Sequence, residues 1–447
     1  MDRPACGPQC LRVLEALGAN GAPVIGENSV VQSTTSAECP SPLTALTRPL
    51  TGEVPAGLGQ AQHGLHMNRE QLPQRLGQGG LFLLCVVISA WTLPSHVVGC
   101  DAHLFLEDDL ATERALADSV AEFARRAPNE EAFHTGSARF DGEWAFGSAL
   151  MSIVGLAQVV EAHPELRSRY LPAMEQAAEQ LMREETSAFG RDAWGEGPLT
   201  GLAHGQGHAY MGYAALALGV LREVDPETRF APAHDALVHG LARNLEASEL
   251  GVLETYPGEA YPCDISSVVG AIGLHARLTG LSQTALIARE AALFRGRWID
   301  PESGYLVQSV DPRTGAPRDA PRGSGTALSA FFWSFAEPSM SRELDHALLT
   351  QGRAEFAGFG GIREYGPGHL GLGDIDSGPV LFGVSVSATG FSLSAARRAG
   401  DEEAFQSLFR TAALFGVSVP RGEGARFLSG GPLGNAIMLA MLTARPV

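Results

Sequence analysis

The residues best suited to chemistry in this sequence are carboxylates that stand just before long apolar stretches. Asp374 and Asp376 precede the small and apolar residues 379–398, and Asp141 and Glu143 open a second apolar stretch. Two neighbouring carboxylates can separate their pKa values, so that one donates a proton while the other accepts one. The same residues can instead cap a helix and face the positive end of its dipole. The pattern therefore predicts either acid–base catalysis or helix capping.

A third group of polar residues lies in the segment 256–264, with the sequence YPGEAYPCD. A thiol beside a carboxylate is a poor thiolate, because the negative neighbour raises its pKa. Cys263 is therefore interpreted as a small buried residue. Its neighbour Asp264 is either a helix cap or an acid–base group.

An acid–base enzyme needs one carboxylate of each kind. We expect Asp376 to act together with Asp264 or Asp141, because all three are expected to open buried helices. A carboxylate at a helix N-terminus has its charged form stabilised, which suits a base better than an acid. Glu259, between Gly258 and Ala260, has the more apolar setting and is the predicted acid.

The sequence HGQGH contains two histidines, His204 and His208, four residues apart. On a helix this spacing could bind a metal, but the intervening glycines indicate a loop and no H-E-x-x-H motif is formed. We expect a hydrogen-bonding or proton-transfer role, or loop structure, and neither a metal nor a cofactor. The side chains expected to contact substrate are Trp144, His204, His208, Tyr210, Tyr256, Tyr261, His369 and Asp374.

Twelve helices are expected to carry these residues, because amphipathic and wholly apolar stretches alternate along the chain. The apolar ones are 143–162, 208–221, 264–278, 325–335, 379–398 and 433–443. The amphipathic ones are 104–126, 165–183, 232–246, 283–297, 341–356 and 402–415.

A helix that is apolar all round must be surrounded by protein. Six amphipathic helices outside six apolar ones give an all-α (α/α)6 toroid of six helical hairpins. An open solenoid is the alternative, and the strongly apolar inner helices favour closure. No useful β-strand is expected apart from a short one at 304–310. In a closed ring the loops before the inner helices meet on one face, where we expect the binding pocket.

Composition excludes several functions. The net charge of −18 argues against a nucleic-acid partner, because phosphate binding needs a basic surface. The chain contains no lysine, which excludes a Schiff-base lysine, pyridoxal phosphate chemistry and a Walker A lysine.

The first 100 residues are expected to lie outside the toroid domain, 101–447. Residues 1–66 have no periodic apolar face, which is typical of disorder or of sequence upstream of the true start. Residues 67–100 have the pattern of a signal peptide, with two arginines before the apolar run 81–91. The VVGC sequence that ends at Cys100 resembles a bacterial lipobox.

That resemblance implies cleavage, lipid attachment at Cys100 and a lipid-anchored, extracytoplasmic protein of the bacterial cell envelope. A plain signal peptide or anchor with an incidental cysteine, and a chain that is not exported, are the alternatives. Of the six cysteines, only Cys263 follows Cys100, so no disulfide is expected within the toroid domain.

The expected ring, with loops rich in Asp, Glu, Tyr, Trp and His, resembles the six-hairpin glycosidases, sugar epimerases and polysaccharide lyases. Those relatives imply a carbohydrate-active enzyme, a saccharide or other small-molecule substrate, and carboxylate acid–base chemistry. The sequences around Asp264 and Asp374 are also similar to the linalool dehydratase/isomerase-like toroids, which implies an apolar substrate. That family uses a pair of cysteines where this chain has Cys263 alone, so its mechanism is not carried over. A non-catalytic binding or scaffold lipoprotein is the third possibility.

Overall fold

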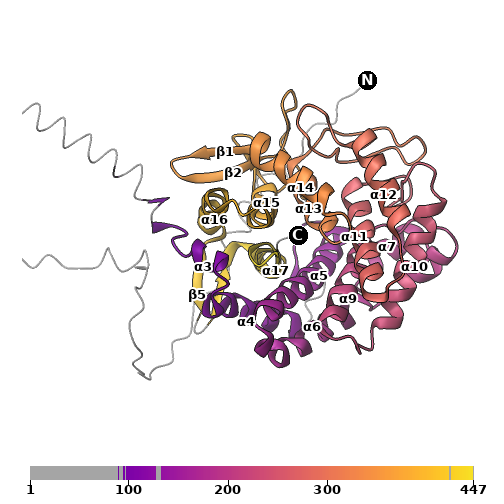
Figure 1. The fold of residues 1–447 in the computed structure, drawn as a ribbon, viewed down its shortest axis with the longest axis horizontal. Coiled ribbons are helices and arrows are strands. Elements are labelled where there is room, and N and C mark those ends of the chain that lie inside the picture. Colours follow the sequence, from indigo (N-terminus) through magenta and orange to yellow (C-terminus); the bar gives the residue numbers. More distant parts are fainter. Residues whose placement is uncertain (1–88, 90–93, 96, 127–131, 422–423, 446–447) are drawn as a thin grey trace, which may run out of the picture. The chain divides into compact units, whose positions relative to one another are not determined.

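The computed structural model describes residues 89, 94–95, 97–126, 132–421 and 424–445, all within the unit Gln60–Val447. In this part of the chain, six apolar helices form a closed ring (Figure 1). Each contacts the next, and the last contacts the first. In chain order the inner helices are α5 (Ala138–Ala162), α9 (Met211–Val224), α11 (Pro262–Thr279), α13 (Gly323–Trp333), α15 (Val386–Ala399) and α17 (Gly431–Leu442).

A second layer of helices, also counted within the described residues, covers the ring from outside. It comprises α4 (Leu110–Arg126), α6 (Arg167–Leu181), α10 (Ala231–Ala247), α12 (Thr284–Leu293), α14 (Pro338–Ala347) and α16 (Glu402–Gly416). The predicted (α/α)6 toroid is therefore confirmed, and the contact between α17 and α5 excludes the open solenoid. The predicted domain boundaries at residues 66 and 100 fall where most residues lie outside the described ones, and they stay predictions.

Small residues let the inner helices approach closely. A β-carbon on Gly155 of α5 would lie 2.9 Å from the backbone nitrogen of Ala440 of α17, a distance that forces the helices apart. Gly155 therefore helps to close the ring. The helix α5 is long and apolar enough to span a membrane, but most of its apolar window is buried among its neighbours, as in a core helix.

Short strands interrupt the helices, and here the expectation of almost no β-structure was wrong. A four-stranded antiparallel sheet has the order β1-β2-β4-β3, and β5 pairs with β6. The segment 304–310 forms only isolated bridges, including Leu306 with Ile299. The strands are β1 (Arg353–Phe356), β2 (Phe359–Arg363), β3 (Val380–Leu381), β4 (Val384–Ser385), β5 (Ser418–Arg421) and β6 (Gly424–Phe427).

Two expected helices are shorter than predicted because of this sheet. The helix expected at 341–356 ends at Ala347, passes through the π-helical turn Leu348–Gly352 and continues as β1. The helix expected at 379–398 begins at Val386, after the β3–β4 hairpin. Phe382 and Gly383 turn that hairpin with positive φ angles of 53° and 84°, which a helix does not allow.

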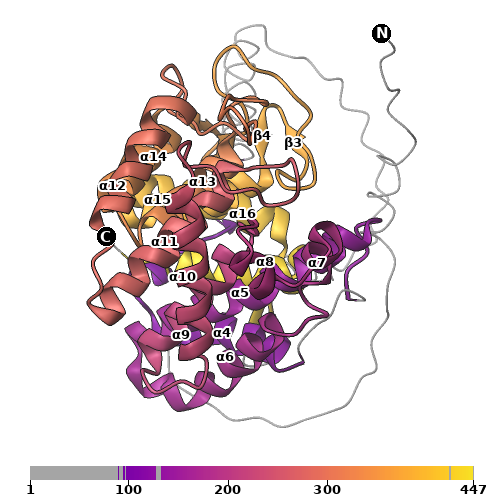
Figure 2. The same cartoon turned by 90° about the vertical axis from the view of Figure 1, so that its right-hand side faces the viewer.

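Further short elements fill the connections: α3 (Ala102–Leu106), α7 (Ala188–Trp194), α8 (Pro198–Ala203), η3 (Pro164–Leu166), η4 (Phe294–Trp298) and η6 (Leu428–Gly430). Figure 2 shows α7, α8, β3 and β4 along one side of the ring. They lie in the connections that precede inner helices, so this side is where those helices begin. We call it the mouth.

A buried histidine between α10 and its neighbours predicts acid sensitivity. His234 is fully buried, and neither of its ring nitrogens has a hydrogen-bond partner in the described structure. The centroid of its ring lies 5.1 Å from that of the His275 ring. Burial is the main cause that lowers the pKa of His234 to about 4, and His275 and Arg222 add to it. As the pH falls below about 6.5, His234 becomes protonated in the unfolded chain, whereas in the folded protein it stays neutral until the pH approaches 4. The folded state therefore loses stability between about pH 6.5 and 4, by about 3 kcal/mol in total.

We expect His234→Phe to remove this loss, so that urea unfolding at pH 4.5 and pH 7 gives more similar free energies than in the wild type. His204→Phe is the matched control, because His204 is exposed and pairs with Glu196 across 3.0 Å. Equal pH dependence in His234→Phe and the wild type would show that His234 is not the sensitive group.

Candidate active site

Three carboxylates from separate parts of the chain meet at the mouth. Glu143 lies in the first turns of α5, Asp264 lies in the first turn of α11, and Asp376 lies in the loop before β3. The negative charges of Glu143 and Asp264 both raise the pKa of Asp376, and Glu143 also raises the pKa of Asp264. Such coupling requires proximity. We call Glu143, Asp264 and Asp376 the mouth cluster.

Asp264 is held by hydrogen bonds to both carboxylate oxygens. Tyr213 of α9 donates to Oδ1 at 2.6 Å, and Thr255 donates to Oδ2 at 2.5 Å. Burial, partly opposed by these two donors, raises the pKa of Asp264 to about 6. Two donors fix the orientation of the carboxylate and favour its ionised form.

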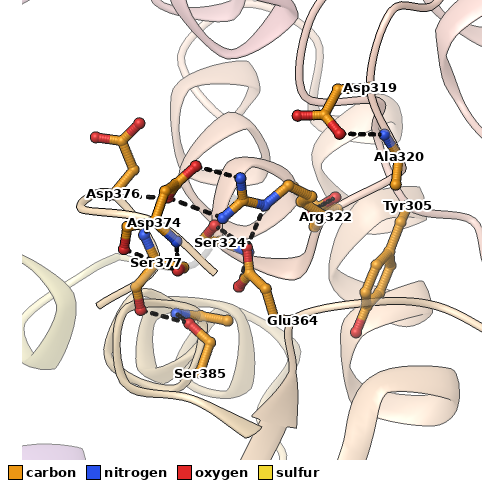
Figure 3. Close-up of polar contacts among 12 residues, drawn as sticks. Tyr305, Asp319, Ala320, Arg322, Ser324, Glu364, Asp374, Asp376, Ser377 and Ser385 are labelled. Atoms are coloured by element: carbon orange, nitrogen blue, oxygen red, sulfur yellow. Dashed lines mark hydrogen bonds and ion pairs between the residues drawn. The ribbon is translucent and has the colours of Figure 1, made fainter. Parts of the chain in front are cut away.

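Asp376 has a different environment. Its backbone nitrogen donates to Asp374 Oδ1, while its own carboxylate points away from that contact (Figure 3). No hydrogen bond to the Asp376 carboxylate occurs among the described residues. The side chain keeps contact with solvent, yet desolvation by the surrounding protein is the largest cause that raises the pKa of Asp376 to about 7. The charges of Asp374, Glu143 and Asp264 add to that shift.

Glu143 belongs to a network with an arginine and two tyrosines. Tyr256 donates to Glu143 Oε1 at 2.5 Å, and Arg139 Nε donates to the same oxygen at 3.2 Å. Arg139 also donates to Glu259 at 3.1 Å and lies over the Tyr256 ring, 3.5 Å from its centre. Tyr261 donates to Glu259 at 2.9 Å. Glu259 thus accepts hydrogen bonds from an arginine and a tyrosine, and its role as the acid stays a prediction.

A buried arginine fixes the loop that carries Asp376 (Figure 3). Arg322 donates to Glu364 at 2.6 Å and to both oxygens of Asp374, with Nη2 2.9 Å from Oδ1. Asp374 Oδ1 in turn accepts from the backbone nitrogens of Asp376 and Ser377, each at 3.1 Å. Asp374 therefore shapes the turn, and its contact with substrate stays a prediction.

Neither Asp374 nor Asp376 caps a helix. The helix α15 begins at Val386, and Ser385 caps it by accepting from the Ala388 nitrogen. The expectation that Asp376 opens an inner helix was therefore wrong, because the β3–β4 hairpin intervenes. The acid–base interpretation of Asp376 does not depend on that helix end.

Cys263 precedes Asp264 in the first turn of α11 and packs, partly buried, against the core. The Tyr213 hydroxyl is 3.8 Å from its sulfur, and burial, with the charge of Asp264, raises the pKa of Cys263 to about 12. The thiol is therefore protonated at neutral pH and is a poor nucleophile.

Aromatic side chains pack together beside the mouth cluster. The rings of Tyr210 and Tyr256 stack with centroids 6.0 Å apart, and Trp194 stacks on His208 at 4.9 Å. Burial lowers the pKa of His208 to about 4, so this imidazole is neutral at neutral pH. His208 contacts Gln206 at 2.8 Å and the Tyr210 hydroxyl at 3.3 Å.

Other predicted site residues have separate roles. The Asp141 carboxylate accepts from the backbone and hydroxyl of Thr135, at 2.8 Å each, and so anchors the loop before α5. His204 is exposed and pairs with Glu196. His369 is exposed in a loop near Asp300. Trp144 packs edge-on against Phe133, with centroids 6.2 Å apart.

The residues that sequence reasoning missed are partners of the carboxylates. Arg139, Tyr213 and Thr255 each bond a member of the mouth cluster, and Glu364 pairs with Arg322. Arg139 and Glu143 are four residues apart on one helix, a spacing that signals an ion pair. Tyr213 and Thr255 carry no such signal, because only the packing of α9 against α11 brings Tyr213 to Asp264.

The sequence matches no family model and no curated protein. Among solved structures, the fold is similar to the GH76A alpha-1,6-mannanase from a Salegentibacter species. The identity is 11%, the match covers 73% of this chain and 98% of that one, and the TM-score is 0.45. An inactive variant of that mannanase in complex with alpha-1,6-mannotetrose is similar at 12% identity, with the same coverage and a TM-score of 0.43. These likenesses are too distant to carry any statement about function.

The mouth cluster can hold two carboxylates in different protonation states. Asp264 accepts two hydrogen bonds, whereas the Asp376 carboxylate has only negative neighbours and Arg322 at longer range. The pKa of Asp264, about 6, is lower than that of Asp376, about 7, so between these values more of Asp264 than of Asp376 is ionised. Within the described residues, no group of three or more potential ligands could hold a metal ion.

Proposed function

We propose that this protein is a carbohydrate-active enzyme, a hydrolase, lyase or epimerase, in which Asp376 is the general acid and Asp264 the general base. The single observation that carries the proposal is the contrast between these two carboxylates. Asp264 is oriented and stabilised as an anion by Tyr213 and Thr255, while desolvation and neighbouring negative charges raise the pKa of Asp376 to about 7. This assignment reverses the roles expected from the sequence, in which Asp376 was the base and Glu259 the acid.

The polar surroundings favour a saccharide over an apolar substrate. The mouth cluster is surrounded by further polar groups, namely the hydroxyls of Tyr256 and Tyr261, the Glu259 carboxylate and Arg139. Such groups bind hydroxyl-rich ligands. The high pKa of Cys263 gives no support to a thiolate mechanism. The stacking of both tryptophans over paired carboxylates, which would support a sugar site most directly, does not occur, because Trp194 stacks on His208 and Trp144 contacts Phe133.

The test is a screen of the purified protein against polysaccharides and disaccharides, with Asp376→Asn and Asp264→Asn as parallel samples. We expect the wild type to release reducing ends, form unsaturated sugars or epimerise one substrate, and both variants to lose that activity. Turnover of an apolar alkenol in place of any sugar would favour the linalool-type alternative. Binding of a sugar without turnover would favour a non-catalytic protein.

We also propose export and lipid attachment at Cys100. Support comes from the signal-like residues 67–100 and the lipobox-like VVGC sequence. We expect Cys100→Ala to move the protein from the membrane fraction to the soluble fraction and to abolish acyl labelling. A wild-type protein that is cytosolic and unprocessed would contradict this proposal.

A further inference from the structure

An apolar surface lies on the outer rim of the ring, where α16 ends and β5–β6 begins. Leu414, Phe415, Val417 and Leu428 are each 47–50% exposed. The Leu428 nitrogen donates to the Val417 oxygen at 3.3 Å, so the α16 end and the start of η6 lie together. Single exposed apolar side chains are common, but a cluster of four indicates an interaction surface. We call these four residues the rim patch.

The same side of the ring carries a further exposed aromatic residue. Phe356, at the turn between β1 and β2, is 67% exposed. Arg410 of α16 donates to the oxygen of Gly358 in that turn at 3.2 Å, which places the turn beside α16. Figure 1 shows β1, β2, α16, α3 and β5 on one side of the ring.

A cavity of about 300 Å³ lies next to the rim patch, between α3, α4, α16 and β5–β6. Its walls are mostly apolar and include Leu104, Phe105, Leu116, Phe409 and Phe427. Asp101 lies at the same cavity, and burial is the main cause that raises its pKa.

The N-terminal segment reaches the ring at this place. A β-carbon on Gly99 would lie 3.0 Å from Phe409 and from the Arg410 backbone, so Gly99 packs directly on α16. The apolar run 81–91 comes shortly before it, and residue 100 is the expected lipid attachment site. An uncleaved signal anchor would keep Gly99 on α16, and after cleavage a lipidated Cys100 would directly precede Asp101 at the cavity, so either tether would bring the bilayer to the rim patch.

We propose that the rim patch and the adjoining cavity form a lipid-contact face, which rests on the phospholipid bilayer to which the N-terminal segment tethers the protein. The tether holds the patch at a high effective concentration next to lipid, so half-exposed side chains suffice for stable contact. The net charge of −18 disfavours an anionic surface, and the partner is therefore a zwitterionic bilayer.

The experiment uses the full chain in phosphatidylcholine vesicles whose acyl chains carry bromine, which quenches tryptophan fluorescence on contact. Phe415→Trp adds a tryptophan in the rim patch. Leu281→Trp is the matched control, because Leu281 is 53% exposed in the turn between α11 and α12. Figure 1 shows these two helices across the ring from α16. After subtraction of the wild-type signal, we expect brominated lipid to quench most of the added emission of Phe415→Trp and to leave that of Leu281→Trp unchanged.

Each other outcome overturns the inference. If the protein does not float together with the vesicles, the tether itself is absent. If the protein floats with the vesicles but bromine quenches both added tryptophans equally, or neither of them, the tether is supported and the lipid-contact face is contradicted. If the emission of Phe415→Trp changes with protein concentration and is the same with and without brominated lipid, the rim patch contacts a second copy of the chain.

Discussion

Asp376→Asn is expected to lose activity by roughly a hundredfold or more, the scale of a lost general acid. The substitution keeps the size of the side chain but removes the proton that the acid donates. Melting should stay close to that of the wild type, because the Asp376 carboxylate makes no hydrogen bond within the described structure. The new amide, like the protonated carboxyl, carries no charge beside Asp374, Glu143 and Asp264.

The pH dependence of the wild type provides a second measurement. Activity needs Asp264 ionised, which requires a pH above about 6, and Asp376 protonated, which requires a pH below about 7. We therefore expect an optimum near pH 6.5, with a fall in kcat/KM as the pH rises through 7. The residual activity of Asp376→Asn should lack that alkaline fall, because the group that loses the proton is gone.

Asp319→Asn is the control for this experiment, because Asp319 is an exposed aspartate outside the mouth cluster (Figure 3). It should keep full activity. Full activity in Asp376→Asn, or a marked fall in its melting temperature, would show that Asp376 has a structural role and is not the acid.

The fold was accessible from the sequence because its dominant signal is local. Inner helices such as α5 are apolar on every face, and outer helices such as α4 are apolar on one, which separates two layers without any tertiary information. The strands were missed for the opposite reason. The four residues of β1 become a strand only because β2 pairs with them, and β2 in turn needs β4.

The site was only partly accessible. Asp264 and Asp376 were singled out by residue type and position, and the structure brings them together. Their expected roles came from an assumed helix end at Asp376, which the β3–β4 hairpin displaces. The environment that sets each pKa depends on residues far away in the chain, such as Tyr213 for Asp264 and Glu143 for Asp376. No local pattern carries that information.

Arg322→Met is expected to destabilise the protein by about 3–5 kcal/mol, because it leaves a buried carboxylate without its partner. Arg322 is 2% exposed and Glu364 is fully buried, and the two are joined at 2.6 Å. Among the described residues, the donors left to Glu364 after the substitution are the Ser324 hydroxyl at 2.7 Å and the more distant Ser324 nitrogen at 3.3 Å. Urea unfolding at neutral pH measures the loss.

Two variants separate the buried charge from the lost side-chain packing. In Arg322→Met with Glu364→Gln, the uncompensated charge is gone, so we expect part of the stability to return. Arg295→Met is the surface control, because Arg295 and Glu343 are joined at 2.6 Å while both remain exposed. That substitution should cost no more than about 1 kcal/mol. Equal losses in Arg322→Met and Arg295→Met would contradict the prediction.

Arg322 also connects the core to the proposed chemistry. It holds Asp374, and Asp374 Oδ1 accepts the backbone nitrogens that fix the turn carrying Asp376. Arg322→Met should therefore lower kcat even at temperatures where the protein is fully folded, because the acid is no longer oriented. Asp374→Asn keeps an oxygen for the turn and removes the charge that Arg322 pairs with, so it should retain more activity than Arg322→Met. If Arg322→Met unfolds readily but its folded fraction turns over substrate at the wild-type rate, the arginine stabilises the ring and does not position Asp376.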